Sequence, residues 1–164
     1  MVQKIVEERA KITLEQLLLT VGEPGRASQW LHVDQPLIDA FADATDDHTF
    51  IHVDPDRAAK TQFRGTIAHG LLTLSLLPKL LRTATPLLQG YRVGVNYGFE
   101  RVRFIAPVPV NSRIRGVVAL VEVAEKKAGL YVFTYDVTIE IENNPKPAAT
   151  ARWMLGRWME TTPP

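Results

Sequence analysis

The chain has 164 residues, of which 46% are hydrophobic and 23% charged, and its formal net charge is +1. This size and balance predict one globular domain, residues 1–164, with a substantial core, and they exclude a disordered chain. The balanced charge provides no long-range field for nucleic acid or an anionic membrane, so we expect neither partner. Cysteine is absent, which excludes disulfides, thiolate metal sites and cysteine nucleophiles and fits a cytoplasmic protein.

Two segments are relevant to membrane targeting. Residues 1–9 carry charges where a signal peptide needs an apolar run. The longest apolar stretch, about 71–81, is too short and too polar to span a bilayer. It is interrupted by Thr73, Ser75, Pro78 and Lys79. We therefore expect a soluble protein.

The first part of the chain carries helix signals. Residues 13–16 have the spacing of a capping box, which predicts one or two helical turns. Asp34 is expected to cap a helix over 35–43, and Asp54 a short helix over 55–61. A short strand is expected at 28–33.

The central part of the chain is its most apolar segment. Residues 46–55 and 62–67 have no steady period and are expected to be loops. From about 68 to 81, hydrophobic residues go nearly all the way round a helix. A helix that is apolar on every side belongs inside a protein.

After Gly90 the hydrophobic period changes from 3.6 to 2, which predicts strands. Residues 93–99 alternate, and the apolar phase then moves by one residue, so we expect a bulge near 98–101. Further strands are expected at 113–123, 131–141 and 148–159. Helices followed by an antiparallel meander of four strands predict an α+β fold. A curved sheet wrapped around the 68–81 helix would bury both elements.

Titratable side chains gather in the first irregular segment. Residues 43–55 contain four carboxylates and two histidines, a crowding typical of proton-transfer sites. Asp47 and His52 can be read as an acid–base pair. A metal site is the alternative, but the spacing of His48 and His52 matches no known ligand set, so we expect no metal. His48 can equally be a solvated loop residue, and Asp54 a helix cap only.

A second cluster lies at the start of the apolar helix, where His69 and Gly70 stand next to each other. Exposed backbone N–H groups at such a position are donors for a developing oxyanion. In the alternative interpretation, His69 is a hydrogen-bonded core histidine and Gly70 only allows close packing.

Residues 41–55 resemble the hydratase motif of MaoC-like dehydratases and (R)-specific enoyl-CoA hydratases, most closely the nodulation-protein-N-like branch. In that family an aspartate lies five positions before a histidine, which selects Asp47 and His52. Two later blocks also match, at 67–77 and 96–110.

The resemblance extends from about residue 22 to residue 159 and implies a hot-dog fold, in which the curved sheet wraps around the 68–81 helix. It also implies a homodimer. The implied reaction is the reversible hydration of a 2-enoyl thioester of CoA or acyl carrier protein to the (R)-3-hydroxyacyl thioester. The resemblance implies no metal or redox cofactor.

The resemblance also implies a role for each site residue. Ionised Asp47 takes a proton from a water molecule, and His52 orients that water and helps to deliver a proton to C2. Backbone N–H groups near His69 and Gly70 hold the thioester oxygen. CoA phosphates are expected to meet exposed arginines, for which the candidates are Arg101 and Arg103, with Arg113 and Arg115 beside them. Outward-facing arginines on a sheet are the alternative for these.

The sequence departs from the family pattern at several positions. Asp46 stands where many relatives have glycine, and we expect its carboxylate to raise the pKa of Asp47. Thr49 and Phe50 replace Asn-Pro, and Pro78 with Lys79 replaces the Ser-Gly of some hydratases.

Two other functions remain open at this stage. A hot-dog thioesterase would share the fold but commonly carries a carboxylate on or beside the central helix, and positions 70–81 contain none. A non-catalytic acyl-thioester-binding protein would have no use for two proton-transfer groups.

Overall fold

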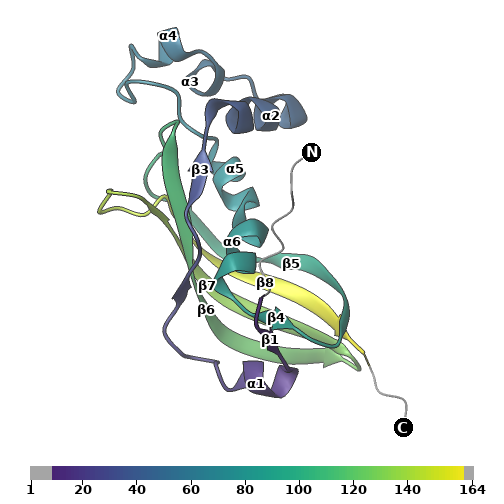
Figure 1. Cartoon of the computed structure of the whole chain (residues 1–164). Coiled ribbons are helices and arrows are strands. Elements are labelled where there is room, and N and C mark those ends of the chain that lie inside the picture. The colour runs from purple at the N-terminus through teal and green to yellow at the C-terminus, as the bar shows by residue number, and fades with distance from the viewer. Residues whose placement is uncertain (1–8, 161–164) are drawn as a thin grey trace.

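The computed structural model describes residues 9–160. We expect no signal peptide in the charged segment 1–9, and residues 1–8 of that segment lie outside the described part. The helices of residues 35–58 lie at one end of a long, curved antiparallel sheet, and the helix of residues 14–18 lies at the other end (Figure 1). Within residues 9–160 no helix is long and apolar enough to cross a membrane.

The helices of the first part begin at the caps that the sequence predicts. Thr13 and Gln16 form a reciprocal capping box, and the carboxylates of Asp34 and Asp54 accept N–H bonds at the starts of their helices. Residues 46–55 are not one loop, because the single turn α3 lies within them. The helices are α1 (Leu14–Leu18), α2 (Gln35–Thr45), α3 (Phe50–Val53), α4 (Pro55–Ala58), α5 (Gly70–Ser75) and α6 (Leu77–Ala84).

The central helix differs from its prediction in two respects. It begins at Gly70 and consists of α5 and α6, which are separated at Leu76. Pro78 is the physical reason, since it has no N–H to donate to the preceding turn. Nor is the helix buried on every side, because one stripe is exposed in the single chain. That stripe contains Leu71, Ser75, Pro78, Lys79 and Arg82.

The main sheet has the strand order β2-β6-β7-β8-β5, with β3 also paired to β6, while β1 and β4 form a small parallel pair. The strands are β1 (Lys11–Ile12), β2 (Arg26–Ala27), β3 (Leu31–Val33), β4 (Leu87–Leu88), β5 (Tyr91–Phe104), β6 (Ser112–Lys127), β7 (Leu130–Ile141) and β8 (Ala149–Met159). The expected meander is wrong, because β5 pairs with β8 and not with β6. The predicted bulge is confirmed by register shifts at Asn96/Gly98 and Phe99/Arg101.

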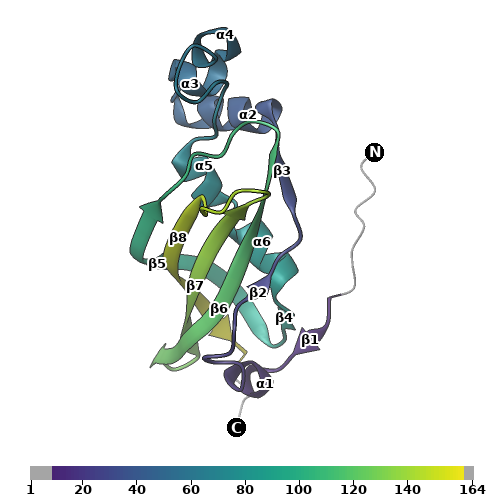
Figure 2. The ribbon, with the colours of Figure 1, turned by 90° about the vertical axis from the view of Figure 1, so that its left-hand side faces the viewer.

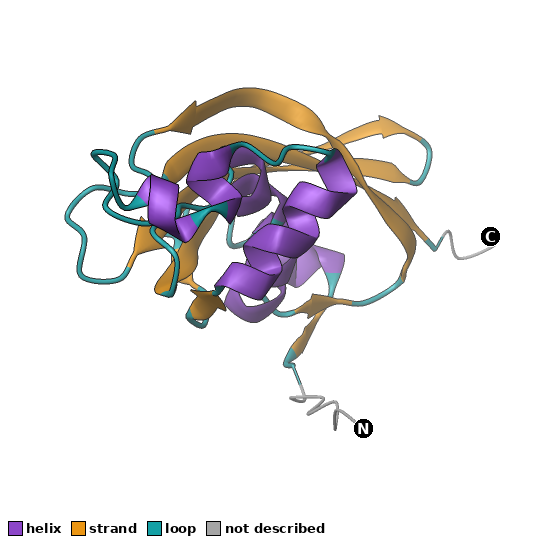
Figure 3. Cartoon of the chain, turned by 90° about the horizontal axis from the view of Figure 1, so that it is seen from above, coloured by secondary structure: helices purple, strands orange, loops and turns teal. Residues whose placement is uncertain are grey.

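The core lies between the concave face of the sheet and the helices. Viewed from above, the sheet arches over α5 and α6 (Figure 3), which is the hot-dog arrangement. Phe133 and Ile139 of the central strand β7 are fully buried against this core. Strand β5 lies at one edge of the sheet (Figure 2), and its residues Tyr91–Tyr97 are exposed.

Candidate active site

A sharp bend at the end of α2 sets the position of Asp47. Asp46 ends the helix in the left-handed conformation, with φ of 56°. The N–H groups of both Asp46 and Asp47 donate to the carbonyl of Ala42, which closes the bend. The next turn, α3, carries His52. The two residues of the predicted pair therefore lie on either side of one short connection.

Thr49 holds the Asp47 carboxylate. Its hydroxyl donates to Asp47 Oδ1 over 2.7 Å, and its backbone N–H donates to the same oxygen over 3.3 Å. These bonds, the hydroxyl first, hold the pKa of Asp47 below its ordinary value. The rise that we expected from Asp46 is therefore wrong, because its side chain is fully exposed and turns toward His48. Asp47 Oδ2 receives neither Thr49 bond.

His52 is a buried side chain with a defined tautomer. Its Nδ1 lies 2.7 Å from the carbonyl oxygen of Ile67. Because a carbonyl only accepts, Nδ1 carries the proton and Nε2 keeps its lone pair. Burial is the main cause that lowers the pKa of His52, so the neutral form is favoured near pH 7. His52 is thus prepared to accept a hydrogen bond at Nε2.

Gln35 fixes the segment that carries His52, a role that no sequence pattern near Gln35 indicates. Its side-chain amide donates to the carbonyl of His52 over 2.8 Å and to Asp39 over 2.7 Å. Its Oε1 accepts from the hydroxyl of Thr66 over 2.6 Å. One side chain thereby ties α2 to α3 and to the chain just before α5.

His69 contacts both members of the pair. Its Nε2 lies 2.9 Å from the carbonyl oxygen of Asp47 and 4.0 Å from Asp47 Oδ2. Its ring stacks on His52 with 3.7 Å between centroids, and Phe41 packs against it at 5.1 Å. The side chain is 4% exposed, and Nδ1 is buried with no hydrogen-bond partner among the described residues.

Asp47, His52 and His69 lie close enough to be considered as metal ligands, with one ligand atom of each within 4.8 Å of the others. The geometry does not favour this use. A metal ion lies in the plane of a histidine that binds it, and two rings stacked face to face at 3.7 Å cannot both point at one ion. The arrangement is suited to proton transfer.

An apolar pocket opens beside His52. It encloses about 790 Å³, including its open mouth. Gly70, the first residue of α5, lines it, and a Cβ at this position would lie 3.2 Å from the Phe104 ring. The first N–H groups of a helix have no acceptor within it. The remaining lining residues are Phe63, Ile67, Ala68, Thr73, Ile105, Ala106, Pro107, Val108 and Ala148.

Comparison with known proteins places this site in a family. The model described as MaoC like domain matches residues 17–141. The chain is 48% identical to nodulation protein N of Rhizobium leguminosarum bv. viciae, over 88% of this chain and 90% of that protein. It is 43% identical to 3-hydroxyacyl-thioester dehydratase Z of Mycobacterium tuberculosis, over 85% of this chain and 91% of that protein. The chain belongs to the MaoC-like family.

A solved MaoC-like structure agrees with the fold. The (R)-hydratase from A. caviae, described as involved in PHA biosynthesis, is 25% identical to this chain with a TM-score of 0.66. The similarity covers 81% of this chain and 95% of that one. The hot-dog arrangement is therefore shared with a protein that carries the hydratase name.

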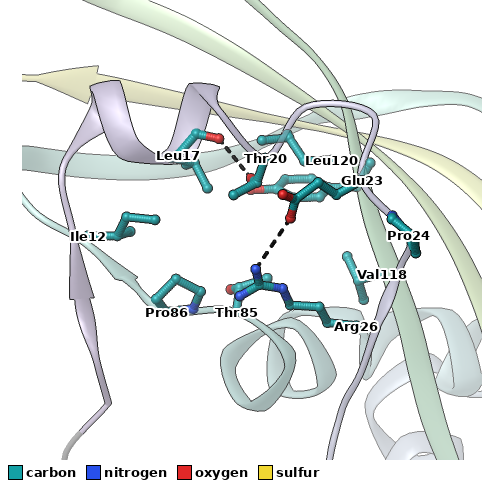
Figure 4. A pocket seen from close by; sticks show the side chains of 11 residues that line it. Ile12, Leu17, Thr20, Glu23, Pro24, Arg26, Thr85, Pro86, Val118 and Leu120 are labelled. Carbon is teal, nitrogen blue, oxygen red and sulfur yellow. Dashed lines mark hydrogen bonds and ion pairs between the residues drawn. The ribbon is translucent and has the colours of Figure 1, made fainter.

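A second pocket lies between α1, β2 and the end of α6, at the other end of the molecule from α5 (Figures 1 and 4). An ion pair of 3.4 Å joins Glu23 and Arg26 on its wall. It encloses about 400 Å³, about half the volume of the pocket beside His52, and none of the candidate site residues lines it. The pocket beside His52 is thus the better candidate for a MaoC-like site.

The four arginines of the predicted phosphate contacts divide into two pairs. Arg113 binds Glu142, and Arg115 binds Glu140 over 2.7 Å, so their charges are already matched. Arg101 and Arg103 are exposed and form no ion pair with any residue in 9–160. Neither lines the pocket, although Arg103 directly precedes the lining residue Phe104.

Proposed function

We propose that this protein catalyses the reversible hydration of 2-enoyl thioesters to (R)-3-hydroxyacyl thioesters. The observation that carries the proposal is the shared position of two complementary groups. The neutral imidazole of His52 lines the apolar pocket, and the ionised carboxylate of Asp47 lies next to that imidazole, with one polar atom of each within 4.8 Å of the other. The names of the dehydratase and hydratase relatives agree with this chemistry.

The proposed mechanism uses one water molecule between the two groups. The water donates one hydrogen to Asp47 and the other to His52 Nε2, so that its lone pair is directed at C3 of the enoyl group. Asp47 takes one proton of the water as the C–O bond forms, and the other hydrogen stays on the new 3-hydroxyl group. The protonated Asp47 then gives its proton to C2, and His52 helps this delivery by holding the hydroxyl oxygen through Nε2, so that both side chains return to their starting forms. The Gly70 N–H stabilises the enolate oxygen that forms between these steps. Atoms balance without a redox group or metal.

The pocket supports an acyl thioester as the substrate. Its walls are almost entirely apolar, which suits an acyl chain, and His52 and Gly70 lie on them. The carrier is CoA or acyl carrier protein. For both carriers we propose phosphate contacts with Arg101 and Arg103, which are exposed and form no ion pair with any described residue.

We further propose that the protein works as a homodimer joined at β5. Three apolar side chains of this edge strand, Val93, Val95 and Tyr97, are 40–51% exposed. An unpaired, apolar edge strand promotes pairing with a second chain. The exposed Phe104 continues this surface to the mouth of the pocket.

Two assays on the same sample test the function. Absorbance of the enoyl thioester is followed with crotonyl-CoA and a longer enoyl-CoA, and free thiol is measured in parallel. We expect absorbance to fall without thiol release, and chiral analysis to give the (R) product. Thiol release would identify a thioesterase instead. No reaction in either assay, with folded protein, would favour a binding role.

The dimer is tested by light scattering after size exclusion. We expect a mass about twice the 18.4 kDa of one chain, because apolar β5 side chains are buried between copies. Val95→Lys places a charge in that interface and should produce monomer. Thr138→Lys, the same change on the central strand β7, is the matched control and should leave the mass unchanged. A monomeric wild type would contradict the proposal.

A further inference from the structure

His69 makes contacts that its place in the core does not require. Its ring fills space between Phe41 and His52, which an aromatic hydrocarbon ring of similar size would also fill. A phenyl ring there would bury no nitrogen, whereas the imidazole leaves Nδ1 buried and unpaired. An unpaired buried polar atom costs free energy. For packing alone, a phenyl ring would therefore stabilise the core more than the imidazole with its unpaired Nδ1.

The polar atom that does find a partner points to the function of this residue. The carbonyl of Asp47 can only accept, so His69 Nε2 carries a proton and donates it over 2.9 Å. This bond is to the main chain of the residue that we assign as the base. The carboxylate of Asp47 is 50% exposed, and apart from Thr49 no described residue donates a bond to it. The direction of that carboxylate therefore depends on the two bonds from Thr49 and on how the backbone of Asp47 is held.

The second contact of His69 is with the other member of the pair. The two imidazole rings lie at an interplanar angle of 27° and 3.7 Å apart. The bond from His52 Nδ1 to Ile67 holds one edge of the His52 ring. The His69 ring packs against the face of that ring and opposes its tilting out of plane. The two contacts together set the direction in which Nε2 points.

We propose that His69 is a positioning residue that holds Asp47 and His52 in one fixed relation, through its Nε2–H and its ring face respectively. This inference rests on the proposed hydration reaction. It assigns the side chain of His69 a task separate from the oxyanion role of the backbone near it. A misplacement of about 1 Å in a reacting group reduces a rate by about 100-fold, so even small movements of the pair would be visible in kcat.

Two substitutions separate the two contacts. His69→Gln keeps a donor at the position of Nε2 but removes the stacked ring, whereas His69→Phe keeps a ring and removes the donor. We expect the Phe variant to lose about 10- to 100-fold in kcat with KM nearly unchanged, because the substrate does not touch His69. The Gln variant should recover part of that loss. Melting temperatures of both variants show whether the fold is retained.

A spectroscopic measurement tests the inference without activity. In nitrogen–proton correlation spectra of the wild-type histidine rings, His69 should carry its proton on Nε2, and His52 on Nδ1. His69→Phe should broaden or shift the His52 ring signals, as the imidazole loses its fixed orientation. If the wild type hydrates no enoyl thioester but these signals appear, the proposed function fails and the positioning contacts stand.

The positioning role is overturned by either of two results. One is a Phe variant that is folded and keeps kcat within about twofold of the wild type. The other is a His69 ring that carries its proton on Nδ1, since the bond to Asp47 would then be absent.

Discussion

Residues 46–70 and the central strands of the sheet are both well packed, but they are held together by different means. In β7, Phe133 and Ile139 are buried by apolar neighbours, and their contribution depends on volume and shape. In residues 46–70, the buried His52 and His69 are held by directional bonds to carbonyl groups. The free energy of unfolding therefore depends mainly on the central strands, and the proposed chemistry depends on residues 46–70. A substitution in one region should leave the property of the other nearly unchanged.

The largest effect is expected for Asp47→Asn, which should lower the activity and leave the stability nearly unchanged. Replacing the carboxylate by an amide removes the proposed base while keeping the shape of the side chain, so kcat should fall by about 10³-fold. The side chain is half exposed, so the melting temperature should change little. His52→Gln should lose activity to a similar degree. Activity of Asp47→Asn close to that of the wild type would remove Asp47 from the mechanism.

The opposite result is expected for Phe133→Ala in the sheet. This side chain is fully buried, and its truncation leaves a cavity that should reduce the free energy of unfolding by about 3–5 kcal/mol. Urea unfolding measures the loss, and Phe133→Leu, a smaller truncation, serves as the graded control. The folded fraction should keep a kcat near that of the wild type. A kcat loss as large as that of Asp47→Asn would show that the core of the sheet also determines the activity.

A smaller change is expected for Thr49→Val, which should move the pH profile. The Thr49 hydroxyl is the first cause of the lowered pKa of Asp47, so its removal raises that pKa. Because the ionised form is the active base, protonation then begins at a higher pH, and the acid limb of kcat/KM moves upward. Thr49→Ser keeps the hydroxyl and should keep the profile. A shift to lower pH, or none, would contradict the assignment.

The smallest effect is expected for Glu140→Gln on the outer face of the sheet. Its bond to Arg115 is 2.7 Å long, but both side chains are more than a third exposed. Such a pair contributes about 0–1 kcal/mol, so thermal unfolding should shift by no more than a few degrees. Activity should be unchanged, since neither residue approaches the pocket beside His52. A strong loss of activity would place a function on this face.

Local signals in the sequence were sufficient for much of the fold. Caps at Asp34 and Asp54 depend on neighbouring residues only, and the bulge in β5 follows from a shift in alternation. Strand pairing depends on contacts between distant segments, so a period of 2 did not distinguish β5 beside β8 from β5 beside β6. The exposed face of α5 and α6 was missed although its Ser75, Lys79 and Arg82 are polar. Leu71 lies among them, so the hydrophobic residues still go nearly all the way round the helix and hide the face from the pattern.

The candidate site could also be predicted only in part. The spacing of Asp47 and His52 within one family motif predicted the pair, and the structure brings both beside His69. The contributions of Gln35 and Thr66 depend on three-dimensional contacts, and no pattern near either residue indicates them. The expected influence of Asp46 on Asp47 assumed that sequence neighbours interact. The bend at the end of α2 turns the side chain of Asp46 away instead.

The left-handed backbone of Asp46 has two opposing consequences for the bend at the end of α2. Glycine enters this conformation without steric cost but also enters many others, whereas a residue with a Cβ has fewer alternatives in the unfolded chain and is strained in this one. The Asp46 side chain reaches toward His48, which itself bonds Asp43 of α2 over 2.9 Å. These contacts connect the loop back to α2, so a strained residue is held at the bend that directly precedes Asp47.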